Sequence, residues 1–542
     1  MLGAAASVTQ GSIGLALGYA SVAVPMMVGM ARNGASWRRL AAAPLYAVPV
    51  TIAAGAAVAA AGTLGASLGL SLGGGALATA AGAAATVGAG YVAGRLLARP
   101  SAAQTEYRRG TVVLEDSPVR SARPSRERGG SQRQAAITLA GIPVPEADET
   151  KHFKIIGTTG TGKSTAITEI LASALARGDR AVIADPDGGY LRRFFEPQRG
   201  DVILNPFDPA SRKWDLFGEI HTAYDVEQLA RSLIPDHEGS DRSWRGYART
   251  FFTAVTRRAH EAGVRDVAEL HRLLVSAEPR ELRTLLAGTA AQPFMDEDNS
   301  RMFDSIRSVA SSAVTALEYV GEQRQEPLSV RSWVRGSDDG RRGGVLFIPY
   351  QAGQIAALRS QISAWMRLAI FETMNKPRAD QRLWFVVDEL DAVGQIDGLK
   401  DALARLRKFG GRCVLGLQSI AQVSGTYGHG DAHTVVENCG NSLILRSSAS
   451  EGGGTARFAS GLIGDREILR TTQSRSRRPL DLVGVRTTSQ QVAVEAAILP
   501  SQIEQLPDLT GYLKIASRPE WLRVRLDPAR QADRGREAGY AL

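Results

Sequence analysis

The stretch Gly157-Thr-Thr-Gly-Thr-Gly162-Lys163-Ser164 decides the fold of this chain. It fits the pattern G-x-x-x-x-G-K-[ST], a phosphate-binding loop whose backbone N–H groups face a polyphosphate. Residues 152–156 before it, His-Phe-Lys-Ile-Ile, are typical of a short strand. Residues 164–176 after it repeat apolar side chains at helical spacing. A strand, a glycine loop and a helix in this order predict an α/β nucleotide-binding fold.

The loop residues have distinct expected roles. The glycines let the backbone curl, and Lys163 reaches the β and γ oxygens of the nucleotide. The hydroxyl of Ser164 is expected to ligate Mg²⁺. We predict nucleotide contacts from the whole segment, namely Gly157, Thr158, Thr159, Gly160, Thr161, Gly162, Lys163, Ser164 and Thr165.

A second stretch, Leu383-Trp-Phe-Val-Val387 followed by Asp388-Glu389, supplies two carboxylates at the end of a buried strand. We expect Asp388 to hold the Mg²⁺ shell and Glu389 to polarise the attacking water. Together with the loop, these residues predict an enzyme that hydrolyses a nucleoside triphosphate, with ATP and Mg²⁺ as its cofactors.

Two long segments, residues 1–31 and 40–94, carry no charged side chain. About 20 apolar residues cross a bilayer, so the second segment is long enough for two spans, with Gly73-Gly-Gly75 as a break. Basic residues lie between the segments and after them, and positively charged loops stay cytoplasmic. The sequence therefore predicts an anchor in the inner membrane. It has either three spans with the N-terminus outside or two spans.

Composition agrees with an enzyme on a membrane anchor. The 542 residues allow an anchor and two or three globular units. Cys413 and Cys439 are the only cysteines, so no disulfide framework is expected. The net charge of +9 permits contact with nucleic acid or anionic lipid without establishing either. His429 and His433 flank Asp431 in a glycine-containing stretch, which we interpret as a solvated loop and not a zinc site.

Strand-like runs and helical patterns alternate after residue 136, which predicts a largely parallel sheet. The runs are residues 153–156, 181–184, 202–204, 345–348, 383–387, 414–417 and 443–445, with a last pair, 512–515 and 522–524, expected as an edge hairpin. Between about residues 220 and 321 the strand signals disappear, which predicts a helical insertion. Residues 100–134 are polar and rich in Arg, which is typical of a tether.

Further motifs occur in a fixed order along the chain. They are Arg109-Gly-Thr, Ile142-Pro-Val-Pro145, Asp185-Pro-Asp, a Trp244…Arg249 helix, Arg407-Lys-Phe-Gly-Gly411, Leu417-Gln418-Ser-Ile-Ala-Gln422, Pro500-Ser-Gln-Ile and Leu506-Pro-Asp-Leu. With the phosphate loop and Val-Val-Asp-Glu-Leu, this order resembles the type IV secretion coupling proteins of the TraD/TrwB class, which are conjugation ATPases. The resemblance covers nearly the whole chain. The membrane region departs from it, because the family usually has two spans around a small periplasmic part.

The resemblance implies a RecA-like P-loop NTPase core with an all-α insertion domain, preceded by N-terminal transmembrane helices. The expected parts are a transmembrane anchor of two or three helices (1–98), a basic linker (99–135), a first core part (136–219), the all-α insertion (220–321), a second core part (322–526) and a polar C-terminal tail (527–542). The family is a homo-hexamer in the inner membrane, multi-pass, with its ATPase domain in the cytoplasm.

The resemblance also implies roles for two more catalytic residues. Gln418 ends a strand expected beside the strand of Asp388, where its amide would bond the γ-phosphate or its water. The family places an arginine finger at Arg407, which would act on a neighbour's nucleotide. The alternative role for Arg407 is structural. A basic residue at the end of a helix over 398–408 complements the helix dipole.

Two function classes remain open. The first is a motor that drives DNA, bound without sequence specificity, into a type IV secretion channel by DNA-dependent ATP hydrolysis. The second is a receptor that recruits relaxase or effector proteins to the channel components, with little DNA pumping. DNA-stimulated ATPase activity distinguishes the two classes.

Overall fold

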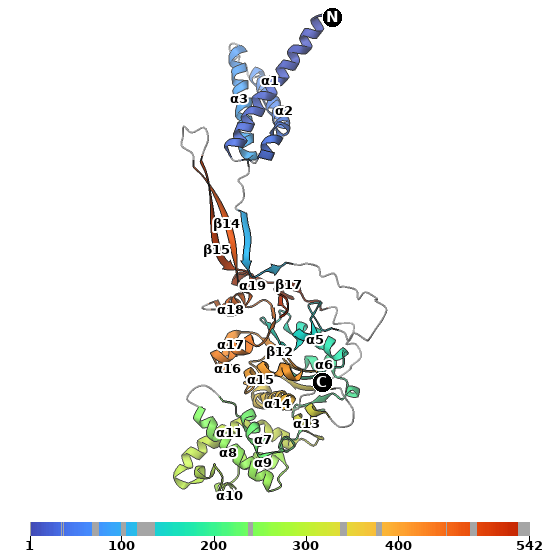
Figure 1. Ribbon diagram of the computed structural model, residues 1–542, viewed down its shortest axis with the longest axis vertical. Helices are drawn as coiled ribbons and strands as arrows, with labels where there is room; N and C mark the ends of the chain where they lie inside the picture. The colour runs from blue at the N-terminus through green and yellow to red at the C-terminus, as the bar shows by residue number, and fades with distance from the viewer. Residues whose placement is uncertain are drawn as a thin grey trace. The chain divides into compact units, whose positions relative to one another are not determined.

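The computed structural model describes residues 2–33, 35, 37–67, 75–98, 104–115, 136–236, 242–336, 344–375, 382–450, 453–476 and 485–528. Two compact units share the chain. The first comprises Met1–Arg109 and Arg466–Glu495, and the second comprises Gly110–Asp465 and Ala496–Leu542. Figure 1 labels the helices and strands of both units.

The described residues of the first unit form three helices, α1 (Leu2–Arg32), α2 (Trp37–Ser67) and α3 (Gly75–Leu97). Among the described residues, Gly14–Arg32 and Trp37–Ala60 are long and apolar enough to cross a membrane, each with a mean hydropathy of 1.6. The expected break at Gly73-Gly-Gly75 lies mostly outside the described residues, and α3 begins at its last glycine.

Glycines bring α1 and α3 into backbone contact. A Cβ on Gly90 would lie 2.4 Å from the carbonyl oxygen of Val22, and one on Gly94 would lie 2.2 Å from that of Met26. Small residues at such positions let helices approach closely in lipid. The contact pairs Val22–Gly90 and Met26–Gly94 advance in the same direction along both helices, so α1 and α3 run parallel.

A three-stranded sheet in the order β1-β14-β15 completes the first unit, from β1 (Gln104–Gly110), β14 (Asp465–Ser476) and β15 (Val485–Ala496). Arg109 Nε donates to Glu467 Oε2 at 2.7 Å, and Arg466 Nη2 donates to Glu495 Oε1 at 2.9 Å. Part of the segment expected as a tether is therefore strand. The strand was not predicted because its side chains are mostly polar and form no apolar run. Ion pairs and pairing between strands hold this sheet together instead.

The second unit is built on a ten-stranded sheet in the order β2-β17-β16-β13-β5-β12-β11-β6-β10-β7. Strands β13 to β7 of this order run parallel, whereas β16 is antiparallel to both its neighbours. The bounds are β2 Val113–Leu114, β5 Phe153–Ile156, β6 Arg180–Pro186, β7 Val202–Ile203, β10 Val345–Tyr350, β11 Leu383–Val387, β12 Gly411–Leu417, β13 Asn441–Ile444, β16 Thr510–Lys514 and β17 Trp521–Arg525.

Every strand-like run read from the sequence is confirmed as a strand of this sheet. The expected edge hairpin β16–β17 exists, but it is not the edge, because β2 pairs with β17 on its outer side. The central strands are buried on both faces, which explains their continuous apolar runs.

Helices cover both faces of the sheet. Along β6, Ala181 and Ile183 pack into one core cluster while Val182 and Ala184 pack into the other. One face carries α5 (Lys163–Ala176) and the small hairpin of β3 (Thr138–Leu139) and β4 (Ile142–Pro143). The other carries α14 (Ile355–Asn375), α15 (Leu399–Leu406) and α17 (His429–Glu437).

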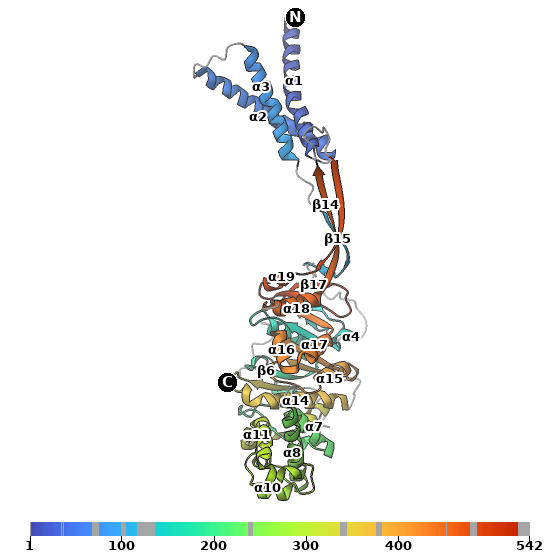
Figure 2. The same ribbon diagram turned by 90° about the vertical axis from the view of Figure 1, so that its left-hand side faces the viewer.

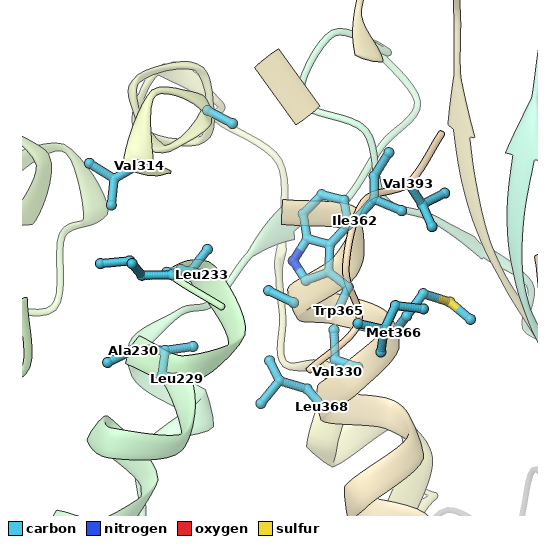
Figure 3. Close-up of a cluster of buried hydrophobic side chains, with 14 of the residues drawn as sticks. Leu229, Ala230, Leu233, Val314, Val330, Ile362, Trp365, Met366, Leu368 and Val393 are labelled. Atoms are coloured by element: carbon cyan, nitrogen blue, oxygen red, sulfur yellow. The ribbon is translucent and has the colours of Figure 1, made fainter. Parts of the chain in front are cut away.

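The all-α insertion lies between β8 (Lys213–Trp214) and β9 (Pro327–Leu328), which pair in parallel at its base. Its helices are α7 Ala223–Leu233, α8 Arg242–Glu261, α9 Val267–Val275, α10 Pro279–Leu285, α11 Ser300–Val314 and α12 Ala316–Glu322. They gather next to α14 in both views (Figures 1 and 2). Figure 3 shows Leu229 and Leu233 of α7 near Ile362 and Trp365 of α14, all fully buried.

Short helices complete the second unit. They are α4 Glu146–Glu149, α6 Gly189–Phe194, α13 Val330–Arg335, α16 Ile420–Tyr427, α18 Gly454–Ile463 and α19 Pro500–Glu504. The stretch around His429 is helix α17 and not the expected loop, because Ala432, Val435 and Val436 bury one of its faces. Among the described residues, no group of three or more potential metal ligands surrounds it. Cys413, in β12, and Cys439 are both buried free cysteines.

Candidate nucleotide-binding site

The glycine loop joins β5 to α5. Gly160 and Gly162 have φ angles of 78° and 113°, a region that residues with a Cβ rarely adopt. A Cβ on Gly157 would lie 2.7 Å from Thr161 Oγ1. α5 begins at Lys163, so its unpaired N–H groups face the loop as an anion site.

Lys163 is held inside the loop. Its Nζ donates to the carbonyl oxygens of Gly157 at 2.8 Å and Thr158 at 3.3 Å. Burial lowers the pKa of Lys163, while Asp388 and Glu389 oppose that shift. The Lys163 ammonium therefore already lies at the loop. Phosphate oxygens of a bound nucleotide could replace the carbonyl oxygens of Gly157 and Thr158 as its hydrogen-bond acceptors.

Asp388 meets the loop from the end of β11. Its Oδ2 accepts hydrogen bonds from Ser164 Oγ at 2.7 Å and from the Tyr190 hydroxyl at 2.8 Å. Its Oδ1 is buried and has no partner among the described residues. Mg²⁺ prefers oxygen ligands of this kind, so a free carboxylate oxygen beside a serine hydroxyl fits the expected magnesium ligands.

Gln418 bridges Glu389 and the loop. Its Nε2 donates to Glu389 Oε1, and its Oε1 accepts from Thr159 Oγ1 at 3.4 Å. β12, which ends just before Gln418, pairs with the Asp388 strand β11, as expected, and it pairs with β5 on its other side. Burial raises the pKa of Glu389, with smaller contributions from nearby Asp388 and Asp391, which suits a group that must accept a proton.

Tyr190 and Asp185 belong to the site, and sequence reasoning assigned them no role. Asp185, at the end of β6, accepts the backbone N–H groups of Tyr190 at 3.1 Å and Leu191 at 2.7 Å, so it holds the start of α6. Burial raises the pKa of Asp185 to about 7 and that of the Tyr190 phenol well above its usual value. The only available signal was the Asp185-Pro-Asp motif.

Leu509 closes the loop from a distant part of the sequence. Its backbone N–H donates to Thr161 O at 3.0 Å, and its carbonyl accepts from the Leu526 N–H at 2.7 Å. The open cavity beside the loop, of about 470 Å³, is lined by Thr159, Gly160, Gly162, Lys163, Ser164, Thr165, Thr168, Pro186, Asp187, Gly189, Tyr190, Arg193, Asp388, Glu389 and Leu509.

Arg407 is the predicted site residue that the structure keeps apart from the others. α15 ends at Leu406, and Arg407 begins a 3₁₀ turn that Gly410 closes with a φ of 74°. The helix is therefore shorter than expected. Arg407 precedes β12, whereas Gln418 follows it, and a strand of 7 residues spans about 20 Å. Its side chain is exposed and makes no hydrogen bond or ion pair with any part of the chain that the structure describes.

The arrangement defines a class of protein. A parallel sheet places the phosphate loop on β5 and the Asp388-Glu389 pair on β11, with one strand between them. This strand arrangement and the cavity beside the loop define a P-loop NTPase with a RecA-like core. Residues 136–527 match the model of the type IV secretion-system coupling protein DNA-binding domain. The chain belongs to the family of type IV secretion-system coupling proteins.

Individual relatives agree with this family. The chain is 31% identical to the coupling protein TraD of Escherichia coli (strain K12) over 430 residues, which cover 78% of this chain and 59% of TraD. It is 20% identical to VirD4 of Rhizobium radiobacter over 396 residues, which cover 68% of this chain and 56% of VirD4. The chain thus spans less than two thirds of the length of either relative.

Solved structures of the plasmid coupling protein TrwB have the same fold. The complex with a non-hydrolysable ATP analogue is 30% identical, covers 78% of this chain and 94% of the TrwB chain, and has a TM-score of 0.65. The complex with ADP and Mg²⁺ is also 30% identical, covers 79% of this chain and 95% of the TrwB chain, and has a TM-score of 0.66.

Proposed function

We propose that this chain is a membrane-anchored ATPase that drives DNA or a nucleoprotein into a type IV secretion channel. One observation carries the proposal. Ser164, Asp388 and Glu389 converge on a single cavity at the phosphate loop of a coupling-protein fold. The ligands named for TrwB support ATP and Mg²⁺ as the cofactors of this cavity.

The residues of the site divide the work of hydrolysis. The loop N–H groups and Lys163 bind the phosphates, while Ser164 Oγ and Asp388 would hold Mg²⁺, which would supply neutralisation of the phosphate charge. Glu389 accepts the proton of the attacking water. Gln418 orients Glu389 and contacts Thr159, so it connects the carboxylate to the loop that senses the γ-phosphate.

Arg407 acts on a neighbouring subunit in this account. About 20 Å of strand separates it from its own site, which is beyond the reach of one side chain. An exposed arginine beside another subunit's nucleotide would stabilise the charge of the transition state. We therefore infer a ring, and a homo-hexamer is the form that the family resemblance favours.

The membrane anchor has three spans with the N-terminus outside. The parallel contact between α1 and α3 supports this topology, because a connecting helix α2 must then return across the bilayer. Arg32, Arg38 and Arg39 would lie on the same side as Arg95 and the ATPase domain, in the cytoplasm. A reporter fused within residues 32–39 should read cytoplasmic. A periplasmic reading there would favour two spans.

ATPase measurements on the full chain in lipid vesicles test the proposed function. Adding DNA should increase turnover, and raising the salt concentration should remove the increase, because phosphate contacts weaken with salt. The Glu389→Gln variant serves as the inactive control. Turnover that ignores DNA but rises with a relaxase or effector protein would instead support the receptor function.

A further inference from the structure

His152 is a buried histidine that the nucleotide chemistry leaves unexplained. It precedes β5, is 1% exposed and has a φ of 58°. Its ring makes two hydrogen bonds within the chain. Nδ1 accepts from the backbone N–H of Cys413 at 3.1 Å, and Nε2 lies 2.9 Å from the carbonyl oxygen of Leu403.

These partners fix the state of the ring. Since Nδ1 accepts a hydrogen bond, the proton sits on Nε2 and is donated to Leu403. Burial lowers the pKa of His152 to about 4, so the ring stays neutral at physiological pH. His152 is therefore a permanent link between strand and helix and not a pH sensor.

The helix that His152 holds is the one that leads to Arg407. Leu403 lies in the last turn of α15, and its carbonyl is one of those that a helix end leaves short of partners. The 3₁₀ turn of Arg407 follows directly. A donated hydrogen bond at this carbonyl fixes both the end of α15 and the direction in which the turn leaves it.

A second clamp holds the far side of the turn. A Cβ on Gly411 would lie 2.5 Å from Leu406 Cγ, so the chain returns closely past the end of α15. Arg412 Nε then donates to the buried carboxylate of Glu149 at 2.8 Å. The turn of Arg407 is thus held on both sides, and its own side chain is exposed.

His152 is also tied to the nucleotide strand. Its carbonyl oxygen accepts from the backbone N–H of Asn441 at 3.1 Å and from Asn441 Nδ2 at 3.0 Å. The next residue, Phe153, begins β5, which ends at the phosphate loop. A displacement of β5 on nucleotide binding would therefore reach α15 through His152.

We propose that His152 is a positioning residue for Arg407, holding α15 so that Arg407 reaches the nucleotide of a neighbouring subunit. The proposal rests on the proposed function, in which Arg407 acts in trans. It predicts that the bond from Nε2 to Leu403 matters for the finger, whereas the bond from Cys413 to Nδ1 does not.

Two substitutions separate these bonds. His152→Asn places an acceptor near the position of Nδ1, tolerates the positive φ, and loses the donor to Leu403. His152→Gln places an N–H near the position of Nε2 and keeps that donor. We expect His152→Asn to lower turnover on the order of 10- to 100-fold, the effect of a small misplacement of a reacting group. We expect His152→Gln to retain most of it, although it fits the backbone less well.

Subunit mixing distinguishes a finger defect from damage to the variant's own site. His152→Asn should bind ADP as tightly as the unsubstituted chain. A mixture of His152→Asn with Glu389→Gln should recover activity, because Glu389→Gln has an intact Arg407 although its own site cannot hydrolyse ATP. A mixture of His152→Asn with Arg407→Ala, which lacks a finger, should not recover.

Opposite results would overturn the proposal. If His152→Asn instead damaged its own nucleotide site and left Arg407 functional, activity would recover in mixtures with Arg407→Ala. It would not recover in mixtures with Glu389→Gln. If His152→Asn fails to bind ADP, the His152→Gln variant decides, and loss of its turnover contradicts the role of the bond to Leu403. The mixture of Arg407→Ala with Glu389→Gln is the control, since its failure would refute the trans site itself and not the role of His152.

Discussion

Removing the phenol oxygen of Tyr190 should weaken the use of Mg²⁺ in the proposed ATP hydrolysis. Tyr190 and Ser164 both donate to Asp388 Oδ2, at 2.8 and 2.7 Å. With the Ser164 hydroxyl used as a ligand of Mg²⁺, Tyr190 would be the donor that still orients the carboxylate. Tyr190→Phe therefore leaves Asp388 free to rotate away from the metal.

The size of the effect follows from the hydrogen bond that is lost. A bond to a charged group contributes about 1.5–3 kcal/mol, and 1.4 kcal/mol is about tenfold in an equilibrium constant. Residues that orient metal ligands typically cost about 10- to 100-fold in metal affinity when changed. We expect the Mg²⁺ concentration for half-maximal turnover to rise by about tenfold or more, with little change in ADP binding without metal.

A magnesium titration of ATP turnover by the full chain measures this effect. Tyr350→Phe is the matched control, because its hydroxyl is buried near the same carboxylates but has no partner among the described residues. Its magnesium dependence should match that of the unsubstituted chain. A Tyr190→Phe titration within twofold of it, or an equal shift in both variants, would refute the role assigned to Tyr190.

Lys163→Ala should abolish binding of a fluorescent nucleotide, whereas Glu389→Gln should bind it and lose turnover by about 10²–10⁴-fold in phosphate release; full turnover would exclude Glu389 as the catalytic carboxylate. Because burial raises the pKa of Asp185 from 3.8 to about 7, the folded chain keeps a proton there that the unfolded chain releases, and this stability is lost as the pH rises through about 7. Thermal melts from pH 5 to 8 should show that loss, and Asp185→Asn should flatten it; an unchanged slope would contradict the assignment. In detergent, Gly94→Leu should lower the melting temperature because a Cβ there meets the backbone of α1, whereas Gly88→Leu should not, since nothing lies within 4 Å; equal effects would argue against the packing of α1 on α3.

The sequence was informative wherever one local pattern carried the structure. The strand-like runs that became β5, β6, β11 and β12 were recognisable because both faces of these strands are buried and most of their side chains are apolar. The phosphate loop and Asp388-Glu389 were recognisable because their chemistry needs adjacent residues. Gln418 could be placed because the family resemblance assigned it a role and an apolar strand ends just before it.

Other features depended on contacts that no local pattern encodes. β14 and β15 consist largely of polar residues, so no apolar pattern in the sequence predicts them as strands. Ion pairs of Glu467 and Glu495 with arginines stabilise them. Leu509 reaches the phosphate loop from more than 300 positions away. Tyr190 was missed because no local pattern marks it, and only the folded sheet brings its hydroxyl to Asp388.

One measurement tests the composite active site most directly. Arg407→Ala and Glu389→Gln are each expected to be inactive alone, the first with a loss on the order of a thousandfold or more. Mixed rings contain interfaces that pair an intact Glu389 site with an intact Arg407 from the neighbour. The account predicts that phosphate release returns in such mixtures in proportion to these interfaces. No recovery in oligomers shown to contain both variants would contradict it.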